Sequence, residues 1–421
     1  MNDWTRRDVL AMLGAAAVTP LARSAWRGPA PDPAGPGFRI RTITAGTTLR
    51  GPADTERLHA ALTFLKNAKR AVADAGYEVQ TVRIATQPFL EGATTRARAD
   101  ALPALQALDR TMVAEGVLLS IGPALGPDGD DPEFPAWAAE LARTTQNVSF
   151  TVRVASAERT ASPRGVTAAG EAMVAIAHST PGGIGNFRFA AAANVPPGTP
   201  FFPVAYHGGS DAVAIGLESP PLLSAAFAGA NTLAEAKQRL TQSLESRLGS
   251  LERLMRSVAH HDERAYLGID VSPAPGKDAS IGAAIEALTG VPFGAASTLA
   301  ACAAITDVLK SLRIKTCGYS GLMLPVLEDP VLAQRASEGR FTVRELLLYS
   351  TVCGTGLDVV PFAGDVGADQ LAALVVDVAA LSTKLRKPLS ARLFPVPGRK
   401  VGEVAKFTNP YLTDCAVMKL E

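Results

Sequence analysis

The feature that most constrains the fold of this sequence is a regular alternation of strand-like and helical segments. Residues 38–49 (FRIRTITAGTTL) alternate β-branched and polar side chains, as a strand does. Residues 54–75 then carry apolar side chains at helical spacing, and residues 78–86 (EVQTVRIAT) are typical of a second strand. Strands joined through a crossover helix usually run parallel, so this pattern predicts an α/β fold with a parallel or mixed sheet.

The same interleaving continues to the end of the chain, without a repeat of fixed period. We expect further strands at residues 117–121, 148–155, 186–192, 266–271 and 314–317. We expect further helices at residues 99–115, 132–146, 166–178, 230–261, 278–289, 296–311, 342–353 and 368–386. Because the pattern is continuous, residues 38–421 are predicted to form a single α/β domain.

The N-terminal residues are of a different kind. Arg6 and Arg7 precede a short apolar run at residues 10–21, and small residues follow it. These features resemble a twin-arginine (Tat) export signal, which we place at residues 1–25, with a Pro/Gly linker at residues 26–37. The alternative is an ordinary amphipathic N-terminal helix. Export predicts contact with the Tat machinery and a periplasmic or extracellular location.

The overall composition excludes several classes of protein. With 41 basic and 40 acidic side chains the net charge is +1, which argues against a nucleic-acid partner. Apolar residues make up 47% of the chain and charged ones 19%, so a large core can form and bulk disorder is excluded. No segment of the mature chain has 18 uninterrupted apolar residues, so no transmembrane anchor is expected. We expect a small-molecule ligand and a homo-oligomer.

Several segments of the body together resemble one protein family. They include IRTITAG (40–46), GNFRFAAAANVPPGTPFFPVAYH (185–207), CGYSGLMLPVLED (317–329) and VCGTGLDVVPFAGD (352–365). The resemblance is to domain of unknown function 711, a bacterial and archaeal family described as pyruvate formate-lyase-like. It covers about residues 38–421. It implies a large α/β barrel of about ten strands with outer helices, similar to glycyl-radical enzymes.

The resemblance does not carry over the radical chemistry of those enzymes. Their RVxGY-type motif is missing near the C-terminus, where FTNPYLTDCAVMKLE stands instead. A glycyl radical is also destroyed by oxygen, which suits an exported protein poorly. We therefore expect a protein without glycyl-radical catalysis.

Acidic residues that follow strand-like segments are the candidate metal ligands. Asp270, Glu328, Asp358 and Asp365 all stand in Gly/Pro-rich loops, where α/β folds gather ligands at the carboxyl ends of strands. If they converge, they form an all-oxygen cluster of the kind that Ca²⁺ or Mg²⁺ prefers. Each residue also has a simpler role, as a turn or helix-capping residue.

Four other residues are candidates for catalysis. Arg188 lies in a strand-like run between two phenylalanines, where a buried guanidinium would need a carboxylate partner or an anionic ligand. His207 precedes a Gly-Gly turn and is a candidate general base or metal ligand, or simply a surface or core histidine. Tyr206 could donate a hydrogen bond or a proton, or only pack. Cys317 has small neighbours and is either an accessible thiol or a small buried residue.

These candidates leave two classes of function open. The first is an enzyme acting on a small polar or anionic molecule at the barrel mouth, with a divalent cation or a His/Asp pair. The second is a periplasmic small-molecule-binding or structural protein that kept the fold without its radical chemistry. The two differ in whether Asp270, His207, Cys317 and Asp358 line one cavity.

Overall fold

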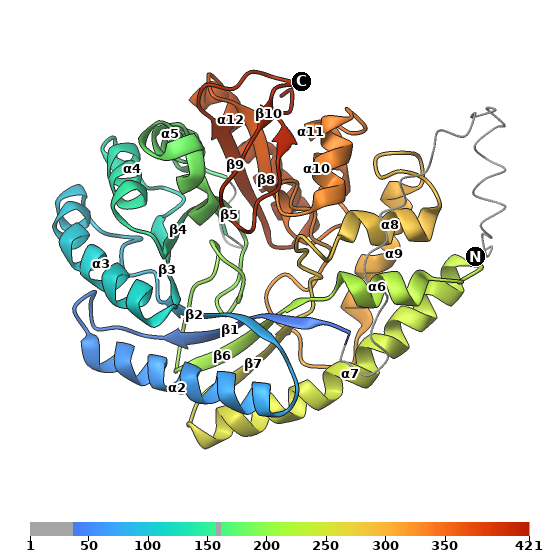
Figure 1. Cartoon of the computed structure of the whole chain (residues 1–421). Helices are drawn as coiled ribbons and strands as arrows, with labels where there is room; N and C mark the ends of the chain where they lie inside the picture. Colours follow the sequence, from blue (N-terminus) through green and yellow to red (C-terminus); the bar gives the residue numbers. More distant parts are fainter. Residues whose placement is uncertain (1–36, 157–160, 421) are drawn as a thin grey trace.

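The computed structural model describes residues 37–156 and 161–420. The predicted export signal, and the linker up to residue 36, lie outside these residues. The described chain is a mixed α/β structure, which confirms the α/β part of the predicted fold class (Figure 1). Within it, one large sheet has nine hydrogen-bonded strands in the order β7-β6-β1-β2-β3-β4-β5-β9-β8.

The strands of this sheet are short, and most run parallel to a neighbour. Their bounds are β1 Arg39–Thr47, β2 Val79–Thr86, β3 Leu118–Leu125, β4 Val148–Ala155, β5 Phe189–Ala193, β6 Ala212–Glu218, β7 Ala265–Asp270, β8 Gly356–Ala363 and β9 Leu389–Val396. Strands β1 to β5 form a parallel run, whereas β6 is antiparallel to β1 and β9 is antiparallel to β5. A separate hairpin near the C-terminus pairs β10 Val404–Ala405 with β11 Cys415–Ala416.

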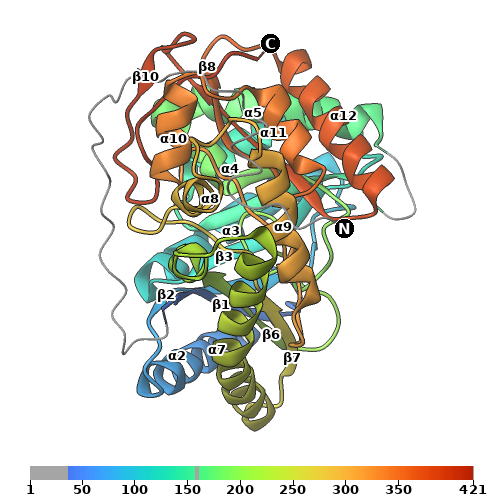
Figure 2. The ribbon, with the colours of Figure 1, turned by 90° about the vertical axis from the view of Figure 1, so that its right-hand side faces the viewer.

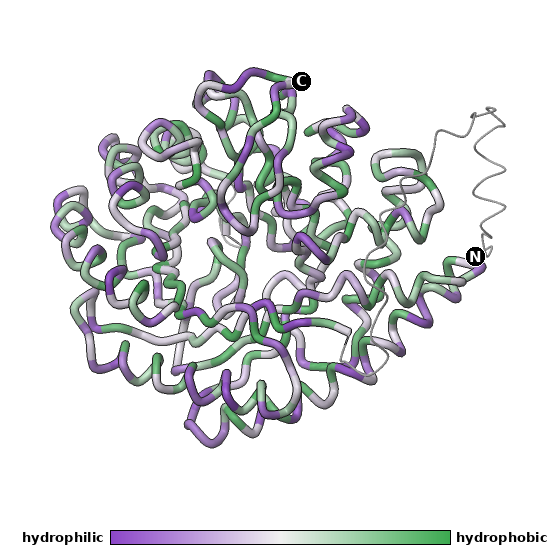
Figure 3. Tube along the Cα trace, viewed as in Figure 1, coloured by the Kyte–Doolittle hydropathy of each residue, from purple (hydrophilic) through white to green (hydrophobic). Residues whose placement is uncertain are grey.

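Helices follow most of the strands and lie on the outer side of the sheet. Their bounds are α2 Thr55–Asp74, α3 Thr95–Glu115, α4 Phe134–Thr144, α5 Pro163–Ser179, α6 Pro220–Phe227, α7 Leu233–His261, α8 Ile281–Thr289, α9 Thr298–Ser311, α10 Pro330–Ser337, α11 Val343–Ser350 and α12 Ala368–Leu385, with a 3₁₀ segment η1 at Pro181–Arg188. Seen from the side, α7 lies against α2 and beside β6 and β7 (Figure 2). The outer turns of the helices are mostly polar and their inner turns apolar, as expected of amphipathic helices on a sheet (Figure 3).

The two faces of the sheet are covered by different kinds of structure. Along β5, Phe189, Ala191 and Ala193 belong to the large core under the helices, whereas Ala190 and Ala192 belong to a smaller apolar cluster on the other face. This split follows from the two-residue period of a strand.

The smaller cluster packs against residues 194–208, which cross the inner face without forming a helix or strand. Thr44 Oγ1 donates to the carbonyl of Pro200 at 3.0 Å, and Ser120 Oγ donates to that of Ala205 at 2.6 Å. The N–H of His207 donates to Thr86 O at 2.9 Å. These bonds hold the segment against β1, β2 and β3.

Residues 316–325 lie against both edges of the sheet. Thr316 forms a parallel bridge with Ile269 of β7, and Pro325 forms one with Asp358 of β8. The predicted strand at residues 314–317 is therefore reduced to a single bridge.

The sequence-based prediction missed three strands of the large sheet and both strands of the C-terminal hairpin, and it placed the other six strands closely. The long helix expected at residues 230–261 is α7. Strands β6, β8 and β9 were not predicted, because nearly every residue in them is buried and no polar alternation marks them. In residues 37–156 and 161–420, no helix is long and apolar enough to cross a membrane.

Candidate functional site

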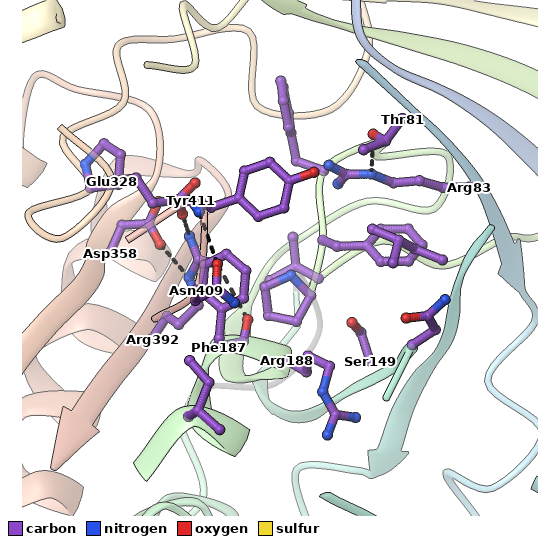
Figure 4. Close-up of a pocket in the computed structure, with 18 of the residues that line it drawn as sticks. Thr81, Arg83, Ser149, Phe187, Arg188, Glu328, Asp358, Arg392, Asn409 and Tyr411 are labelled. Carbon is purple, nitrogen blue, oxygen red and sulfur yellow. Dashed lines mark hydrogen bonds and ion pairs between the residues drawn. The ribbon is translucent and has the colours of Figure 1, made fainter. Parts of the chain in front are cut away.

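A cavity of about 470 Å³ lies against the inner face of the sheet (Figure 4). Five strands contribute a polar side chain to it: Arg41 of β1, Arg83 of β2, Ser149 of β4, Asp358 of β8 and Arg392 of β9. All but Arg83, which lies just past the middle of β2, stand in the first half of their strand. The sequence led us to expect ligands beyond the carboxyl ends of the strands. This cavity lies at the other end of β1, β2, β4 and β8.

One side of the cavity is a buried network of ion pairs. Arg41 joins Glu218 to Glu328, with N–O distances of 2.9 and 2.8 Å. Arg392 joins Glu328 to Asp358, with Nε 2.7 Å from Asp358 Oδ1. All five side chains are less than a tenth exposed. A further arginine, at the first position of β1, also binds Glu218 and pairs with two more carboxylates that are exposed.

Irregular strand pairing helps to direct this network into the cavity. The register of β1 against β6 shifts between Ile40 and Thr42, at Arg41. The register of β8 against β9 shifts between Asp358 and Val360. An extra residue in a strand turns a side chain away from its regular alternation. Both shifts therefore occur beside a charged residue that lines the cavity.

Arg83 stands apart from this network. Its side chain is 7% exposed, its Nε donates to Thr81 Oγ1 at 3.1 Å, and its guanidinium lies 4.9 Å from the ring centre of Phe202. It forms no ion pair with any residue in the described part of the chain. Burial lowers the pKa of Arg83 to about 9, and the neighbouring charge of Arg41 contributes. Arg83 therefore still carries its charge at neutral pH.

The C-terminal segment brings a tyrosine hydroxyl close to Arg83. Tyr411 lies between β10 and β11, and its ring stacks on Phe187 at a centroid distance of 6.4 Å. The guanidinium of Arg41 lies 5.3 Å from the same ring. The Tyr411 hydroxyl has no hydrogen-bond partner among the described residues, and it points toward Arg83 (Figure 4). This hydroxyl can accept a hydrogen bond from Arg83 or donate one to a ligand, whereas no carboxylate pairs with Arg83 among the described residues.

Arg188 borders the cavity, but backbone carbonyls already satisfy it. Its Nη atoms donate to the carbonyls of Ala142, Thr145 and Val148 at 2.6 to 2.8 Å. The first two carbonyls lie at the end of α4, where a helix leaves carbonyls without intrahelical partners. Burial lowers the pKa of Arg188 to about 10. The expectation that Arg188 needs a carboxylate or an anionic ligand is therefore wrong.

The four predicted metal ligands do not form one cluster. Glu328 and Asp358 are neighbours in the ion-pair network, whereas Asp365 is exposed in a turn after β8. Asp270 accepts the backbone N–H groups of Tyr319 and Ser320, both at 2.8 Å, and so ties the turn after residue 316 to the end of β7. In residues 37–156 and 161–420, no three His, Cys, Asp or Glu side chains are grouped to hold a metal ion.

Three predicted catalytic residues lie outside the cavity lining. His207 is buried against Gly46, and burial lowers its pKa, which favours the neutral ring. Tyr206 donates its hydroxyl to Val195 O at 3.0 Å. Burial raises the pKa of the Cys317 thiol well above its usual range, which keeps it protonated at neutral pH. Of the four residues chosen to separate the two functions, Asp358 lines this cavity and the others do not.

Comparison with known proteins places this architecture in a family. A family model described as "Uncharacterised ACR (DUF711)" matches residues 36–409. The chain belongs to the DUF711 family. Among its relatives, a UPF0210 protein of Pyrobaculum islandicum is 33% identical over 86% of this chain and 83% of its own length. One from Neisseria meningitidis serogroup C is 27% identical over 88% of both chains.

A UPF0210 protein of Pyrobaculum arsenaticum is more similar over a shorter stretch. It is 40% identical over 231 residues, and this DUF711 member spans about half of its length. The resemblance recognised in the sequence is thereby confirmed at the level of the family.

Sequence reasoning missed four residues of the cavity in this DUF711 member. They are Arg41, Arg83, Arg392 and Tyr411. The three arginines did leave a signal, because each stands inside a β-branched or apolar strand segment (IRTIT, VRIAT, ARLFP), where a charge is buried at a cost. The same argument was applied only to Arg188. Tyr411 left no comparable signal.

Proposed function

We propose that this DUF711 member binds a small organic anion in the cavity, with Arg83 as its main contact. The observation that carries the proposal is the missing partner of Arg83. Its neighbours Arg41 and Arg392 each hold two carboxylates, whereas Arg83 holds none among the described residues. A buried charge without a partner destabilises a fold, and a bound carboxylate or phosphate would supply the partner.

The size and lining of the cavity support a small organic ligand. Its volume of about 470 Å³ falls in the range of about 300 to 1,000 Å³ that is usual for small-molecule sites. Phe187, Phe201, Phe202 and Met323 also line it and offer apolar surface. These side chains would contact the carbon skeleton of a ligand whose charged group lies on Arg83.

A matched pair of variants tests this proposal. Phenylacetate, succinate and phenyl phosphate would be titrated against the wild type, Arg83→Met and Arg143→Met, with melting temperature and calorimetry as readouts. Arg143 also borders the cavity, but it is half-exposed and paired with Glu140, so its replacement controls for a general loss of positive charge. We expect at least one anion to stabilise the wild type and Arg143→Met but not Arg83→Met. Equal stabilisation of all three proteins, or of none, contradicts the proposal.

We also propose that the protein is an enzyme rather than a carrier, because a titratable carboxyl, that of Asp358, lines the same cavity as the anion site. Burial, with the charge of Glu328, raises the pKa of Asp358, and Arg392 opposes that shift. A carboxyl poised in this way suits general acid–base chemistry. The test is exchange of ligand C–H hydrogens for deuterium in heavy water, followed by NMR. Exchange that Asp358→Asn abolishes without loss of binding supports an enzyme, and no exchange or product with any bound anion supports a carrier.

The barrel implied by the family resemblance remains our proposal for the complete sheet. The two parallel bridges of residues 316–325 support closure through this segment, because they reach β7 on one side and β8 on the other. A crystal structure tests it: backbone hydrogen bonds from this segment to both edge strands support closure, and a solvent-filled gap contradicts it.

A further inference from the structure

The cavity holds an unsatisfied acceptor as well as unsatisfied donors. Asp358 Oδ1 accepts the bond from Arg392 Nε at 2.7 Å, but Asp358 Oδ2 has no hydrogen-bond partner among the described residues. The side chain is 7% exposed and lines the cavity. A carboxylate oxygen can accept about two hydrogen bonds. Asp358 Oδ2 can therefore still accept hydrogen bonds from a ligand.

Glu328 shows that this spare capacity is not general to the network. Its Oε1 accepts from Arg392, and its Oε2 accepts from Arg41 at 2.8 Å. Both oxygens of Glu328 are thus held by arginines. The two carboxylates differ, and only Asp358 of this pair retains an oxygen that a ligand could use.

A hydroxyl just before β8, the strand that carries Asp358, also lacks a hydrogen-bond partner. Thr355 borders the cavity immediately before β8, and its Oγ1 is buried without a hydrogen-bond partner. Two neighbouring hydroxyls are occupied, because Tyr319 donates to Ser390 Oγ at 2.8 Å and Ser390 donates to Thr355 O at 3.1 Å. The β8 side of the cavity therefore has two oxygens, Thr355 Oγ1 and Asp358 Oδ2, without hydrogen-bond partners among the described residues.

The unsatisfied groups lie on two sides of the cavity. Arg83 and Asp358 stand on opposite sides of Tyr411 (Figure 4). Apolar side chains, among them Phe187 and Met323, line the same cavity. A ligand that filled it would meet donors on one side, an acceptor on the other and apolar surface along its length.

We propose that the ligand has two polar ends, an anionic group held by Arg83 and a hydroxyl or amino group that donates to Asp358 Oδ2. The ligand class is therefore the small hydroxylated or amino organic acids. This inference rests on the proposed function, because the anionic group must first bind Arg83. It adds a second contact, and with it a preference among anions that Arg83 alone would not distinguish.

The donor end can be tested with pairs of acids that differ by one hydroxyl. The pairs are 3-hydroxybutyrate and butyrate, 4-hydroxyphenylacetate and phenylacetate, and 3-(4-hydroxyphenyl)propanoate and 3-phenylpropanoate, which differ in length. Affinities would be measured by calorimetry on the full chain. In at least one pair we expect the hydroxylated acid to bind about tenfold tighter, because its bond to a carboxylate is charge-assisted. The neutral 4-hydroxyphenylethanol should bind weakly, since it lacks the group for Arg83.

The variant Asp358→Asn tests whether the preference for the hydroxylated acid depends on Asp358, because it keeps the shape of the side chain and removes its charge. The preference for the hydroxylated acid should fall below about threefold, while the affinity for phenylacetate is kept. The ligand pairs are measured on the wild type, so the test does not depend on how well the variant folds.

The outcomes separate this inference from the proposed function. Acids that bind through Arg83, with no gain from the hydroxyl in any pair, overturn the two-ended ligand and leave the anion site standing. A hydroxyl preference that Asp358→Asn leaves unchanged overturns the role of Asp358. If no acid binds at all, both proposals fail.

Discussion

The two sides of the cavity use the same residue type in opposite ways. On one side Arg41 and Arg392 each donate three hydrogen bonds, two to carboxylates and one to a backbone carbonyl. On the other side Arg83 has one bond to a threonine hydroxyl and no ion pair among the described residues. Sequence surroundings and burial are alike for all three arginines. Residue type and burial therefore do not distinguish these arginines, whereas their hydrogen-bond and ion-pair partners do.

Of the predicted changes, the greatest loss of stability should come from the side of the cavity that holds the ion-pair network. Glu328→Ala removes the carboxylate that joins Arg41 to Arg392 and leaves two buried guanidiniums short of a partner. Breaking a buried ion pair by removing one partner costs about 3 to 5 kcal/mol. Urea unfolding should show this loss. The control Glu140→Ala, which breaks an exposed pair, should lose less than about 1 kcal/mol. A similarly small loss for Glu328→Ala would show that the network contributes little to stability.

The second prediction concerns Arg83, on the side of the cavity without ion pairs, and the effect on stability depends on a bound ligand. Without an anion, Arg83→Met should unfold at the same urea concentration as the wild type or higher, because a costly buried charge is gone. With an anion at a hundredfold excess over its Kd, the wild type should gain about 2.7 kcal/mol and the variant nothing. A large loss of stability in ligand-free Arg83→Met would instead show that Arg83 stabilises the fold, as Arg41 and Arg392 do.

The contribution of Arg83 to stability should also depend on pH, and this effect is smaller. The pKa of Arg83 is lowered to about 9, whereas an unfolded arginine keeps its usual value of 12.5. Between these values the unfolded chain binds more protons, so the stability of the wild type relative to Arg83→Met should rise by up to about 1.4 kcal/mol between pH 9 and pH 10. Below about pH 9 the difference should be flat. Anion affinity should fall over the same range as Arg83 loses its charge, and calorimetry at pH 7, 8, 9 and 10 measures this.

The smallest effect concerns Tyr411, whose ring and hydroxyl have separate contacts. Tyr411→Phe keeps the ring that stacks on Phe187 and removes only the hydroxyl that faces Arg83. Anion affinity should fall about five- to tenfold, in line with the loss of one hydrogen bond to a charged group at a half-exposed position. Stability without ligand should stay within about 0.5 kcal/mol. Tyr266→Phe is the matched control, because that hydroxyl is buried and unpartnered away from the cavity, and its affinity should not change.

The sequence predicts the parallel part of the fold better than the rest. Strands β1 and β2 alternate in polarity and are separated by a helix of ordinary spacing, so local pattern is sufficient to place them. Strands β6 and β9, with the sequences AVAIGLE and LSARLFPV, are buried on both faces and carry no such period. Short apolar runs of this kind cannot be assigned by periodicity alone.

The site could be predicted only in part, because its contacts join distant parts of the chain. The carboxylates of Glu328 and Asp358 were recognised as chemically important, but their arginine partners were not. Arg41 lies 287 residues from Glu328, and no local pattern encodes that pairing. Arg188 and Arg83 gave the same signal of a charge within an apolar strand segment. The carbonyls at the end of α4 that satisfy Arg188 became visible only in the folded chain.

The position of the cavity at the amino ends of β1, β2 and β4 has a consequence for how ligand choice can evolve. The loops before β2 and β4 follow the carboxyl ends of α2 and α4, and residues at the ends of α4 and α5 line the cavity. Such helix ends carry partial negative charge, so the backbone itself disfavours anions. If the proposed anion site is correct, side chains, and mainly Arg83, determine the charge of the ligand that the cavity accepts. A relative with an apolar or acidic residue at that position would accept a neutral or cationic molecule on an unchanged scaffold.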